Sequence, residues 1–314
     1  MTRTQSTADP TPLRPARPAR VADLLALVRP AHCVKSLAVV PLAGLYPAAW
    51  RATSLGRLGW AVLAFVIASG VVYVLNDIAD RHRDRQHPVK RDRPIAAGRV
   101  TVPTAITFAA LLTGLLVVLL PATLPGRWWP VAAYLALNVA YTCRLKHVPL
   151  VDVLTVAMGF VLRVVGGCVA VGVPAGGWLP ISVFCGCLLM TLGKRRAELA
   201  ASAGRAHRPA LRGYSAHLVE LLMLLTAALA AMSYFLYANT DLAPGGIAPL
   251  VTAPCALYGL FRYLQLALED GADPVRLLLG DRPMLVNAVL WVVALGAAVL
   301  VRQHMWLIGA VHYG

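Results

Sequence analysis

Charged side chains are scarce in this chain. Only 14% of its 314 residues are Asp, Glu, Lys or Arg, whereas 59% are hydrophobic and the mean hydropathy is +0.68. A soluble domain of this size carries roughly a quarter of charged residues. The scarcity of charge argues against a soluble enzyme and predicts an all-α integral membrane protein that crosses the bilayer several times.

Several familiar catalytic motifs are also missing. The chain contains no GxxxxGK[ST], HExxH or GxSxG sequence, so nothing supports a P-loop hydrolase, a zinc hydrolase or a serine hydrolase. Its six cysteines include no CxxC pair and no Cys/His metal spacing, which favours buried free thiols over disulfides. Residues 1–22 lack the apolar core of a signal peptide and are rich in Pro, Arg and Thr. They are predicted to form a disordered cytoplasmic tail, followed by a single transmembrane catalytic domain over 23–314.

Apolar segments are abundant, and about nine of them are predicted to be transmembrane helices. Eight or ten spans are the alternatives, because several segments are shorter than the ~20 residues that an untilted helix needs. Their Leu, Val, Ala and Gly content favours closely packed helices over a barrel. The spans are expected at 36–50, 58–75, 101–120, 128–142, 149–171, 178–193, 217–238, 246–265 and 284–301.

Positive charge is concentrated on one side of these spans. The N-terminal tail and the loops after the second, fourth, sixth and eighth spans hold most of the Lys and Arg residues. By the positive-inside rule this side is cytoplasmic, which predicts a multi-pass protein of the cell (plasma) membrane. The net charge of +15 is then explained by topology and by attraction to anionic lipids or phosphate-bearing substrates, rather than by nucleic acid.

The densest charged segment follows the second span and begins NDIADRHRD at residue 76. Asn76, Asp80 and Asp84 recur every four residues, so a helix is expected to stack their oxygens on one face, with Asp77 beside Asn76. Oxygen ligands of this kind suit Mg²⁺, which shares them with substrate phosphates. The three Asp residues are therefore the candidate catalytic residues, and Asn76, Asp80 and Asp84 are the candidate metal ligands.

Basic residues come directly after the acidic ones. Lys90, Arg91 and Arg93 would neutralise phosphate oxygens that the metal does not reach, so the segment predicts a Mg²⁺–diphosphate site at the membrane surface. The alternative is a solvated amphipathic loop whose charges pair with one another.

NDxxDxxxD at 76–84, followed by KRDRPIAAG at 90–98, resembles the UbiA superfamily of intramembrane prenyltransferases. The resemblance runs from about residue 28 to 301. It implies a nine-helix bundle with a central cleft that opens to the cytoplasmic side and laterally to lipid. It also implies that the residues at 76, 77, 80 and 84 are the first acidic motif, which binds Mg²⁺-diphosphate.

The segment after the sixth span departs from that pattern. Most members of the superfamily carry a second acidic motif here, which serves a second Mg²⁺. This chain has GKRRAELAASAGRAHRPALRGY at 193–214, where Glu198 is the one carboxylate among six Lys and Arg residues. A cationic cluster binds a second metal poorly but can bind a second anion directly.

GKRxAEL at this place is similar to the decaprenyl-phosphate phosphoribosyltransferase branch of the superfamily, as are RPAHCVKSLAVVPL at 29–42 and YTCRLKHVPLVDV at 141–153. Enzymes of that branch transfer ribose 5-phosphate from phosphoribosyl pyrophosphate (PRPP) to a polyprenyl monophosphate. Lys194 and Arg195 are expected to position the acceptor phosphate, with Glu198 orienting them, and the alternative is that they are ordinary positive-inside residues.

Other residues are weaker candidates for substrate binding. The resemblance implies that Tyr141 and Lys146 touch the diphosphate, whereas an interfacial Tyr and a snorkelling Lys are the alternative. Arg163 lies three helical turns after Asp152 in the fifth span, and either reaches a substrate phosphate or locks helices through Asp152 or another carboxylate. Lys35, before the first span, either contacts phosphate or anchors the topology.

These features predict a Mg²⁺-dependent transfer of 5-phosphoribose from PRPP to polyprenyl (decaprenyl) phosphate. The first alternative is a UbiA-type prenyl transfer from a prenyl diphosphate to an aromatic acceptor, and the second is a transporter of anionic lipids or metabolites. Expected partners are the two substrates and membrane lipids but no nucleic acid. The sequence leaves open the polyprenyl length, a homo-oligomer and a link to cell-wall arabinan.

Overall fold

The structure, a computed structural model, describes most of the chain. The described residues are 20–30, 36, 51–175, 177–200, 209–242, 247–269 and 280–312. Within these ranges the protein contains nine α-helices, a few short 3-10 or π-helical turns, and no β-strand. The predicted tail, residues 1–22, lies outside the described part except for its last three residues.

The helices of the described part are long, except for the first. Their bounds are α1 (Val21–Val28), α4 (Ala52–Arg85), α5 (Val102–Thr123), α6 (Trp129–Cys143), α7 (Val151–Val171), α8 (Trp178–Ala200), α10 (Ala216–Tyr237), α11 (Ile247–Glu269) and α13 (Arg282–His312).

Each helix from α4 to α13 falls on one of the predicted spans, and the remaining span, 36–50, lies outside the described residues apart from Ser36. Five helices, α4, α5, α7, α10 and α13, are long and apolar enough to cross a membrane on length and composition alone. The prediction of an all-α, multi-pass membrane protein is thus confirmed.

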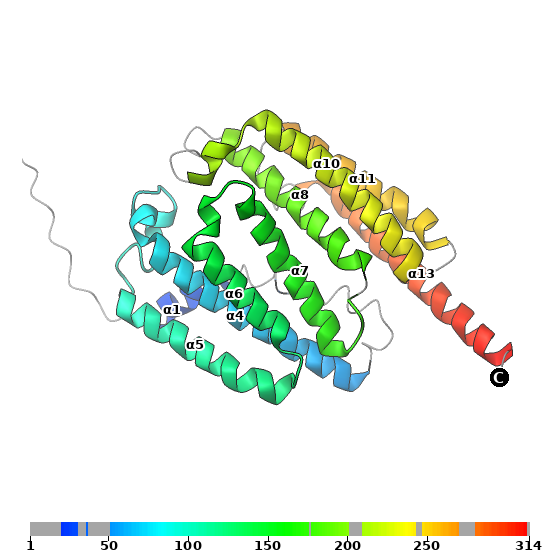
Figure 1. The fold of residues 1–314 in the computed structure, drawn as a ribbon, viewed down its shortest axis with the longest axis horizontal. Helices are drawn as coiled ribbons and strands as arrows, with labels where there is room; N and C mark the ends of the chain where they lie inside the picture. Colours follow the sequence, from blue (N-terminus) through cyan, green and yellow to red (C-terminus); the bar gives the residue numbers. More distant parts are fainter. Residues whose placement is uncertain are drawn as a thin grey trace, which may run out of the picture.

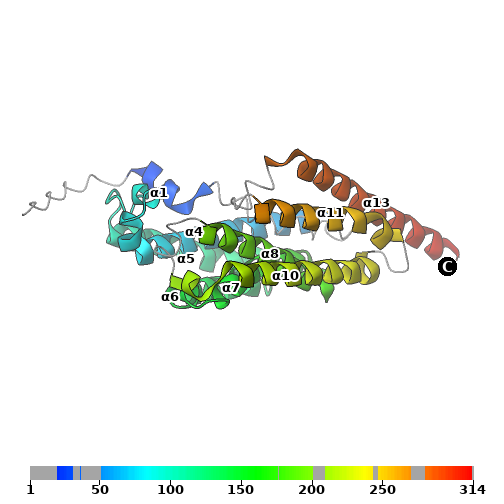
Figure 2. The ribbon, with the colours of Figure 1, turned by 90° about the horizontal axis from the view of Figure 1, so that it is seen from above.

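The helices form one bundle with α4 and α7 at its centre (Figures 1 and 2). α4 packs against α5, α6 and α7, and α8 lies between α7 and α10. α11 and α13 pack on each other at the α8–α10 side, and α13 is largely exposed, as expected for a helix that faces lipid. The short α1 packs beside α4.

Close contact between the two central helices depends on a glycine. A Cβ atom added to Gly166 of α7 would lie 2.4 Å from a ring carbon of Phe65, which is fully buried on α4. Small residues allow helices in membranes to approach in this way. Substitution of Gly166 would therefore push α4 and α7 apart.

α4, α6 and α8 finish, and α5, α7 and α10 begin, at one end of the bundle (Figure 1). The sequence places charged residues at these helix ends. Two of the helices that begin here have side-chain caps: Thr101 accepts a hydrogen bond from the N–H of Thr104, and Ser215 accepts one from Leu218. Because six helix ends meet, segments far apart in the sequence can form a common site.

Candidate active site

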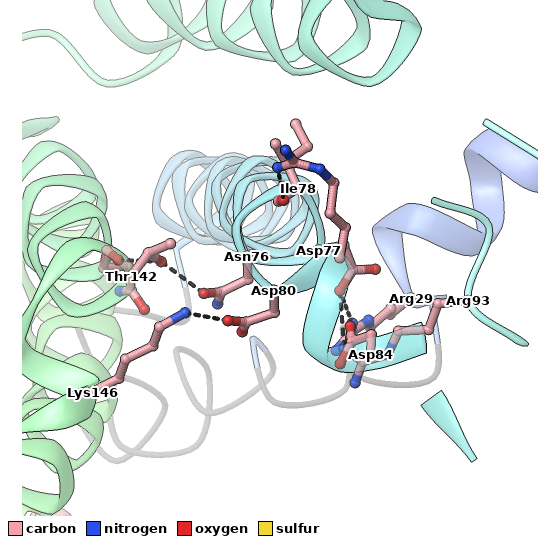
Figure 3. A network of polar contacts seen from close by, with 11 residues as sticks. Arg29, Asn76, Asp77, Ile78, Asp80, Asp84, Arg93, Thr142 and Lys146 are labelled. Atoms are coloured by element: carbon pink, nitrogen blue, oxygen red, sulfur yellow. Dashed lines mark hydrogen bonds and ion pairs between the residues drawn. The ribbon is translucent and has the colours of Figure 1, made fainter. Parts of the chain in front are cut away.

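The acidic motif occupies the last turns of α4, and its side chains point to two different sides of the helix (Figure 3). Asn76 and Asp80 point toward α6, whereas Asp77 and Asp84 point toward the arginines at 29 and 93. Asp77 and Asp84 are buried, with 2% and 4% of their surface exposed. The motif therefore presents two pairs of oxygen ligands rather than one row.

The expectation that Asn76, Asp80 and Asp84 stack on a single face is wrong for Asp84. Seven residues make nearly two full turns of an α-helix, so Asp84 returns to the direction of Asp77, while the eight residues from Asn76 leave a rotation of about 80°. The described residues contain no group of three His, Cys, Asp or Glu side chains arranged to hold a metal ion.

On one side of α4, Arg93 joins the two buried carboxylates. Its Nη1 atom lies 2.6 Å from Oδ2 of Asp84 and 3.2 Å from Oδ1 of Asp77. Asp77 also accepts a hydrogen bond from Arg29, which follows α1 and stacks its guanidinium 5.1 Å from the ring centre of Tyr73. Two cations thus compensate two carboxylates that have little access to water.

On the other side, α6 and the turn after it provide the partners. The hydroxyl of Thr142 donates to Oδ1 of Asn76 at 2.8 Å, and Nζ of Lys146 lies 2.7 Å from Oδ1 of Asp80. Thr142 and Lys146 are four residues apart, as are Asn76 and Asp80, so the two segments match in register. Lys146 is predicted to bind the diphosphate, and its ion pair with Asp80 shows that its side chain reaches the acidic motif.

Two residues of this site, Arg29 and Thr142, are not among the sequence-based candidates. Arg29 opens the RPAHCVK stretch that carries the resemblance, and Thr142 directly follows the candidate Tyr141. The four-residue spacing from Thr142 to Lys146 was the available signal, because it repeats the spacing from Asn76 to Asp80.

The loop between α4 and α5 packs against the end of α4. Lys90 and Arg91 lie in a 3-10 turn, Lys90–Asp92, where Arg91 is exposed. Arg99 extends from the loop to Asp23 of α1, with Nε 2.9 Å from the carboxylate. α1 is therefore tied both to the loop and, through Arg29, to the acidic motif.

A second polar cluster lies at the end of α8, where the basic segment begins. Arg195 is only 2% exposed, and its guanidinium bonds to the carboxylates of Asp152 and Glu198, each at 2.9 Å. Tyr214 donates its hydroxyl hydrogen to Asp152 at 2.6 Å and accepts from the N–H of Leu150 at 2.7 Å. Burial, together with the Asp152 carboxylate, raises the pKa of Tyr214, so the phenol stays protonated.

This cluster joins α7 and α8 to the segment before α10. It also limits what Arg195 can do, since a substrate could reach the guanidinium only after an internal ion pair opens. Lys194, by contrast, is exposed, and Glu198 is half-buried. Lys35 lies outside the described residues, as do 201–208, which carry two more arginines of the basic segment.

Arg163 is buried in the middle of α7 and does not pair with Asp152. Its guanidinium donates to the hydroxyls of Ser69 and Tyr134, at 3.0 and 2.7 Å, and to the carbonyl of Gly159. Among the described residues it has no carboxylate partner, which argues against one of the two alternatives, a helix lock through Asp152 or another carboxylate.

The first cluster has the chemistry of a Mg²⁺–phosphate site. Its acids offer only oxygen ligands, and Mg²⁺ typically takes one or two carboxylates and fills its remaining positions with phosphates and water. Either pair of ligands meets that need. Lys146 bonds to Asp80 and Arg93 bonds to Asp84. Once a metal ion takes the place of these bases on the carboxylates, Lys146 and Arg93 could bind phosphate oxygens.

A partly buried acidic motif flanked by cations therefore lies at one end of a transmembrane bundle. The sequence model of the UbiA prenyltransferase family matches residues 37–289. The chain belongs to this family.

Two relatives within the family carry the same enzyme name. The chain is 32% identical over 295 residues to decaprenyl-phosphate phosphoribosyltransferase of Mycobacterium tuberculosis. The aligned region covers 89% of this chain and 95% of that protein. The enzyme of the same name from Corynebacterium glutamicum is 30% identical, with 90% and 89% covered.

Solved structures share the fold at lower identity. A UbiA homolog from Archaeoglobus fulgidus bound to GPP and Mg²⁺ superimposes with a TM-score of 0.68 at 16% identity, covering 88% of this chain and 99% of the other. The same homolog has also been solved bound to Cd²⁺. The bound metals are consistent with a divalent cation in the family.

Proposed function

We propose that the protein transfers 5-phosphoribose from PRPP to a polyprenyl monophosphate, such as decaprenyl phosphate, and releases diphosphate. The observation that carries this proposal is the difference between the two polar clusters. The acidic motif of α4 offers oxygen ligands for a metal ion, whereas the segment 193–214 carries six Lys and Arg residues and one carboxylate, Glu198, and takes a second carboxylate, Asp152, from α7. The similarity to two phosphoribosyltransferases supports the same assignment.

The donor half of the reaction belongs to the acidic motif. Asn76 and Asp80 on one side of α4, or Asp84 with Asp77 on the other, would hold Mg²⁺, which would supply positive charge against the charge that develops on the leaving diphosphate. Asp77 supports the site through Arg29 and Arg93.

The basic residues around the motif would stabilise the leaving diphosphate. Arg93 and Lys146 exchange their carboxylate partners for phosphate oxygens, and Lys90, Arg91 and Tyr141 complete the phosphate-binding side of the cleft. The bond from C1 of the ribose to the diphosphate oxygen breaks with its electron pair on the diphosphate. Charge stabilisation of this leaving group is the main contribution of the residues to rate.

The acceptor half belongs to the end of α8. A lipid phosphate oxygen attacks C1 from the opposite face and inverts the anomeric centre. This oxygen is already anionic, so no general base is needed. Lys194 is exposed and can meet the phosphate first, while Arg195 and Glu198 form the layer behind it. The isoprenoid tail leaves between helices into the bilayer.

Charge favours this reaction over prenyl transfer to an aromatic acceptor. A phosphate monoester carries roughly −1.5 to −2 near neutral pH, so PRPP and a lipid phosphate bring several negative charges into one low-dielectric cleft. A prenyltransferase must accommodate only one strongly anionic substrate. The basic residues at 193–214 suit the first case.

The same charges suggest the orientation. The bundle end that carries the acidic motif also carries most of the Lys and Arg residues, so we place it on the cytoplasmic side of the plasma membrane. Soluble PRPP would then reach the site from the cytoplasm.

The test is direct. Purified protein in lipid is incubated with radiolabelled PRPP and decaprenyl phosphate, with Mg²⁺ or with EDTA, and lipid-linked label is counted. Metal-dependent label in the lipid is expected. Transfer of the prenyl group from a prenyl diphosphate to an aromatic acid, with release of diphosphate and without transfer from PRPP, would contradict the proposal and favour a prenyltransferase.

A further inference from the structure

Arg163 is the most unusual charge in the described part of the protein. It is 5% exposed, lies in a helix that can span the membrane, and stacks its guanidinium 4.4 Å from the ring centre of Tyr134. Its hydrogen-bond acceptors are neutral: two hydroxyls and a carbonyl. Its Nε–H has no hydrogen-bond partner among the described residues.

A cation in this position is costly for the protein. Arginine in a transmembrane helix normally faces the bundle interior and pairs with an acid, because an uncompensated charge in a low-dielectric environment is strongly disfavoured. Asp152, the acid on the same helix, is bonded to Arg195 and Tyr214. Ring stacking and neutral acceptors reduce the cost of burying Arg163 but leave its charge in place.

The depth of this cation can be worked out from two neighbouring helices. Arg163 contacts Ser69, which precedes Asn76 by seven residues on α4, a rise of about 10 Å. It also contacts Tyr134, which precedes Thr142 by eight residues on α6, a rise of about 12 Å. Because Asn76 and Thr142 are bonded to each other, both measurements start from the same level.

We propose that Arg163 forms a metal-free subsite for a phosphate monoester, about two helical turns inside the bundle from the acidic motif, and that it takes the 5-phosphate of the pentosyl donor. This inference rests on the proposed function and specifies which end of the donor the residue binds. A planar guanidinium with an unsatisfied N–H matches a phosphate dianion in charge and geometry.

The separation favours the donor over the acceptor as the source of this monoester. PRPP carries its diphosphate on C1 and its monoester on C5, so one molecule can extend from the acidic motif inward to Arg163. The acceptor phosphate must lie against C1 for attack, and therefore near the motif and the end of α8 at Lys194. Arg163 would thus select donors that carry a 5-phosphate.

The experiment compares two donors that differ only in this group: PRPP and ribose 1-diphosphate, which lacks the 5-phosphate. The wild-type protein should prefer PRPP in kcat/KM. In Arg163→Gln the preference should fall roughly 10- to 100-fold, the loss expected for a hydrogen bond to a charged group, while the rate with ribose 1-diphosphate changes little. Arg57→Gln, at an exposed position far along α4, is the matched control and should keep the wild-type preference.

Two outcomes would overturn the proposal. An unchanged preference for PRPP in Arg163→Gln would show that the residue does not bind the 5-phosphate. An unchanged preference together with a raised KM for polyprenyl phosphate would assign the monoester to the acceptor. If Arg163→Gln does not fold, Arg163→Lys keeps the charge but loses the planar fork, and the preference should fall by a smaller factor; no change in this variant counts against the proposal.

A binding measurement separates this inference from the proposed function. Ribose 5-phosphate, added with EDTA, should raise the thermal midpoint of the wild type and of Arg57→Gln but not that of Arg163→Gln. This result requires neither metal nor turnover, so it tests the subsite even if no transfer from PRPP is found. Equal stabilisation of all three proteins would reject a monoester site at Arg163.

Discussion

Replacing Asp152 by Asn should destabilise the bundle far more than removal of the partly exposed ion pair between Arg196 and Glu220. Asp152 is fully buried, bonds to Arg195 at 2.9 Å and accepts from Tyr214 at 2.6 Å. Removing one partner of a buried ion pair typically costs about 3–5 kcal/mol, and because Arg195 keeps its bond to Glu198, the cost here should lie toward the lower end. For a chain of this size, the thermal midpoint should fall on the order of 10 °C.

The assay is thermal unfolding of purified protein in detergent, followed by intrinsic fluorescence. The control is the neighbouring pair Arg196–Glu220, whose atoms approach to 2.6 Å but whose side chains are 22% and 34% exposed. An exposed pair is worth about 0.2–1 kcal/mol, so Glu220→Gln should move the midpoint only slightly. The double variant of Asp152→Asn with Arg195→Gln should lose less than the sum of the single losses. Equal shifts for Asp152→Asn and Glu220→Gln would refute the reasoning.

Further predictions concern the site and its surroundings. Asp80→Ala and Asp84→Ala should each abolish PRPP-dependent lipid labelling with normal membrane insertion, and full turnover in either would remove the metal-site proposal. Lys194→Ala should raise the lipid phosphate requirement more than the PRPP requirement, as judged from the two KM values; an unchanged lipid dependence would place the residue outside the acceptor site. The hydrogen bond from Arg262 lowers the pKa of Asp281 below its ordinary value of 3.8, so this carboxylate stabilises the fold above that pH and the contribution is lost as the pH falls through the lowered pKa. Thermal midpoints measured from pH 7 downward should therefore show a smaller acid-induced drop in Arg262→Gln than in the wild type, and identical curves would contradict this linkage.

Most of the fold could be predicted from composition and pattern. Long apolar runs can satisfy their backbone hydrogen bonds in lipid only as helices, so span positions follow from hydropathy. Local chemistry was also visible, because the acids of the motif are spaced for a helix. These features depend on residues close together in the sequence.

The arrangement of partners could not be predicted in the same way. Asp84 could point in the direction of Asp77 or in that of Asp80, because the two directions differ by only a few tens of degrees around the helix axis. The outcome depends on where Arg29 and Arg93 lie. Both arginines come from other segments, so their contacts are set by how α1 and the loop before α5 pack.

Arg195 illustrates the same limit. The basic segment marked it as a substrate ligand, yet its nearest partners are Asp152, 43 residues earlier in the chain, and Glu198. Only the packing of α7 against α8 brings Asp152 to it. Charge alone does not distinguish a side chain that binds a substrate from one that joins two helices.

The length of α4 has a consequence for selectivity. One helix of 34 residues carries both Ser69 and the acidic motif, without a break between them. A continuous helix of this kind is stiff, so the distance between Ser69, which contacts Arg163, and the acidic motif is fixed. If the acidic motif binds the diphosphate and Arg163 the 5-phosphate, as proposed, a sugar phosphate with a different distance between its anionic ends would reach one site but not both, and the enzyme would discriminate by molecular length as well as by charge.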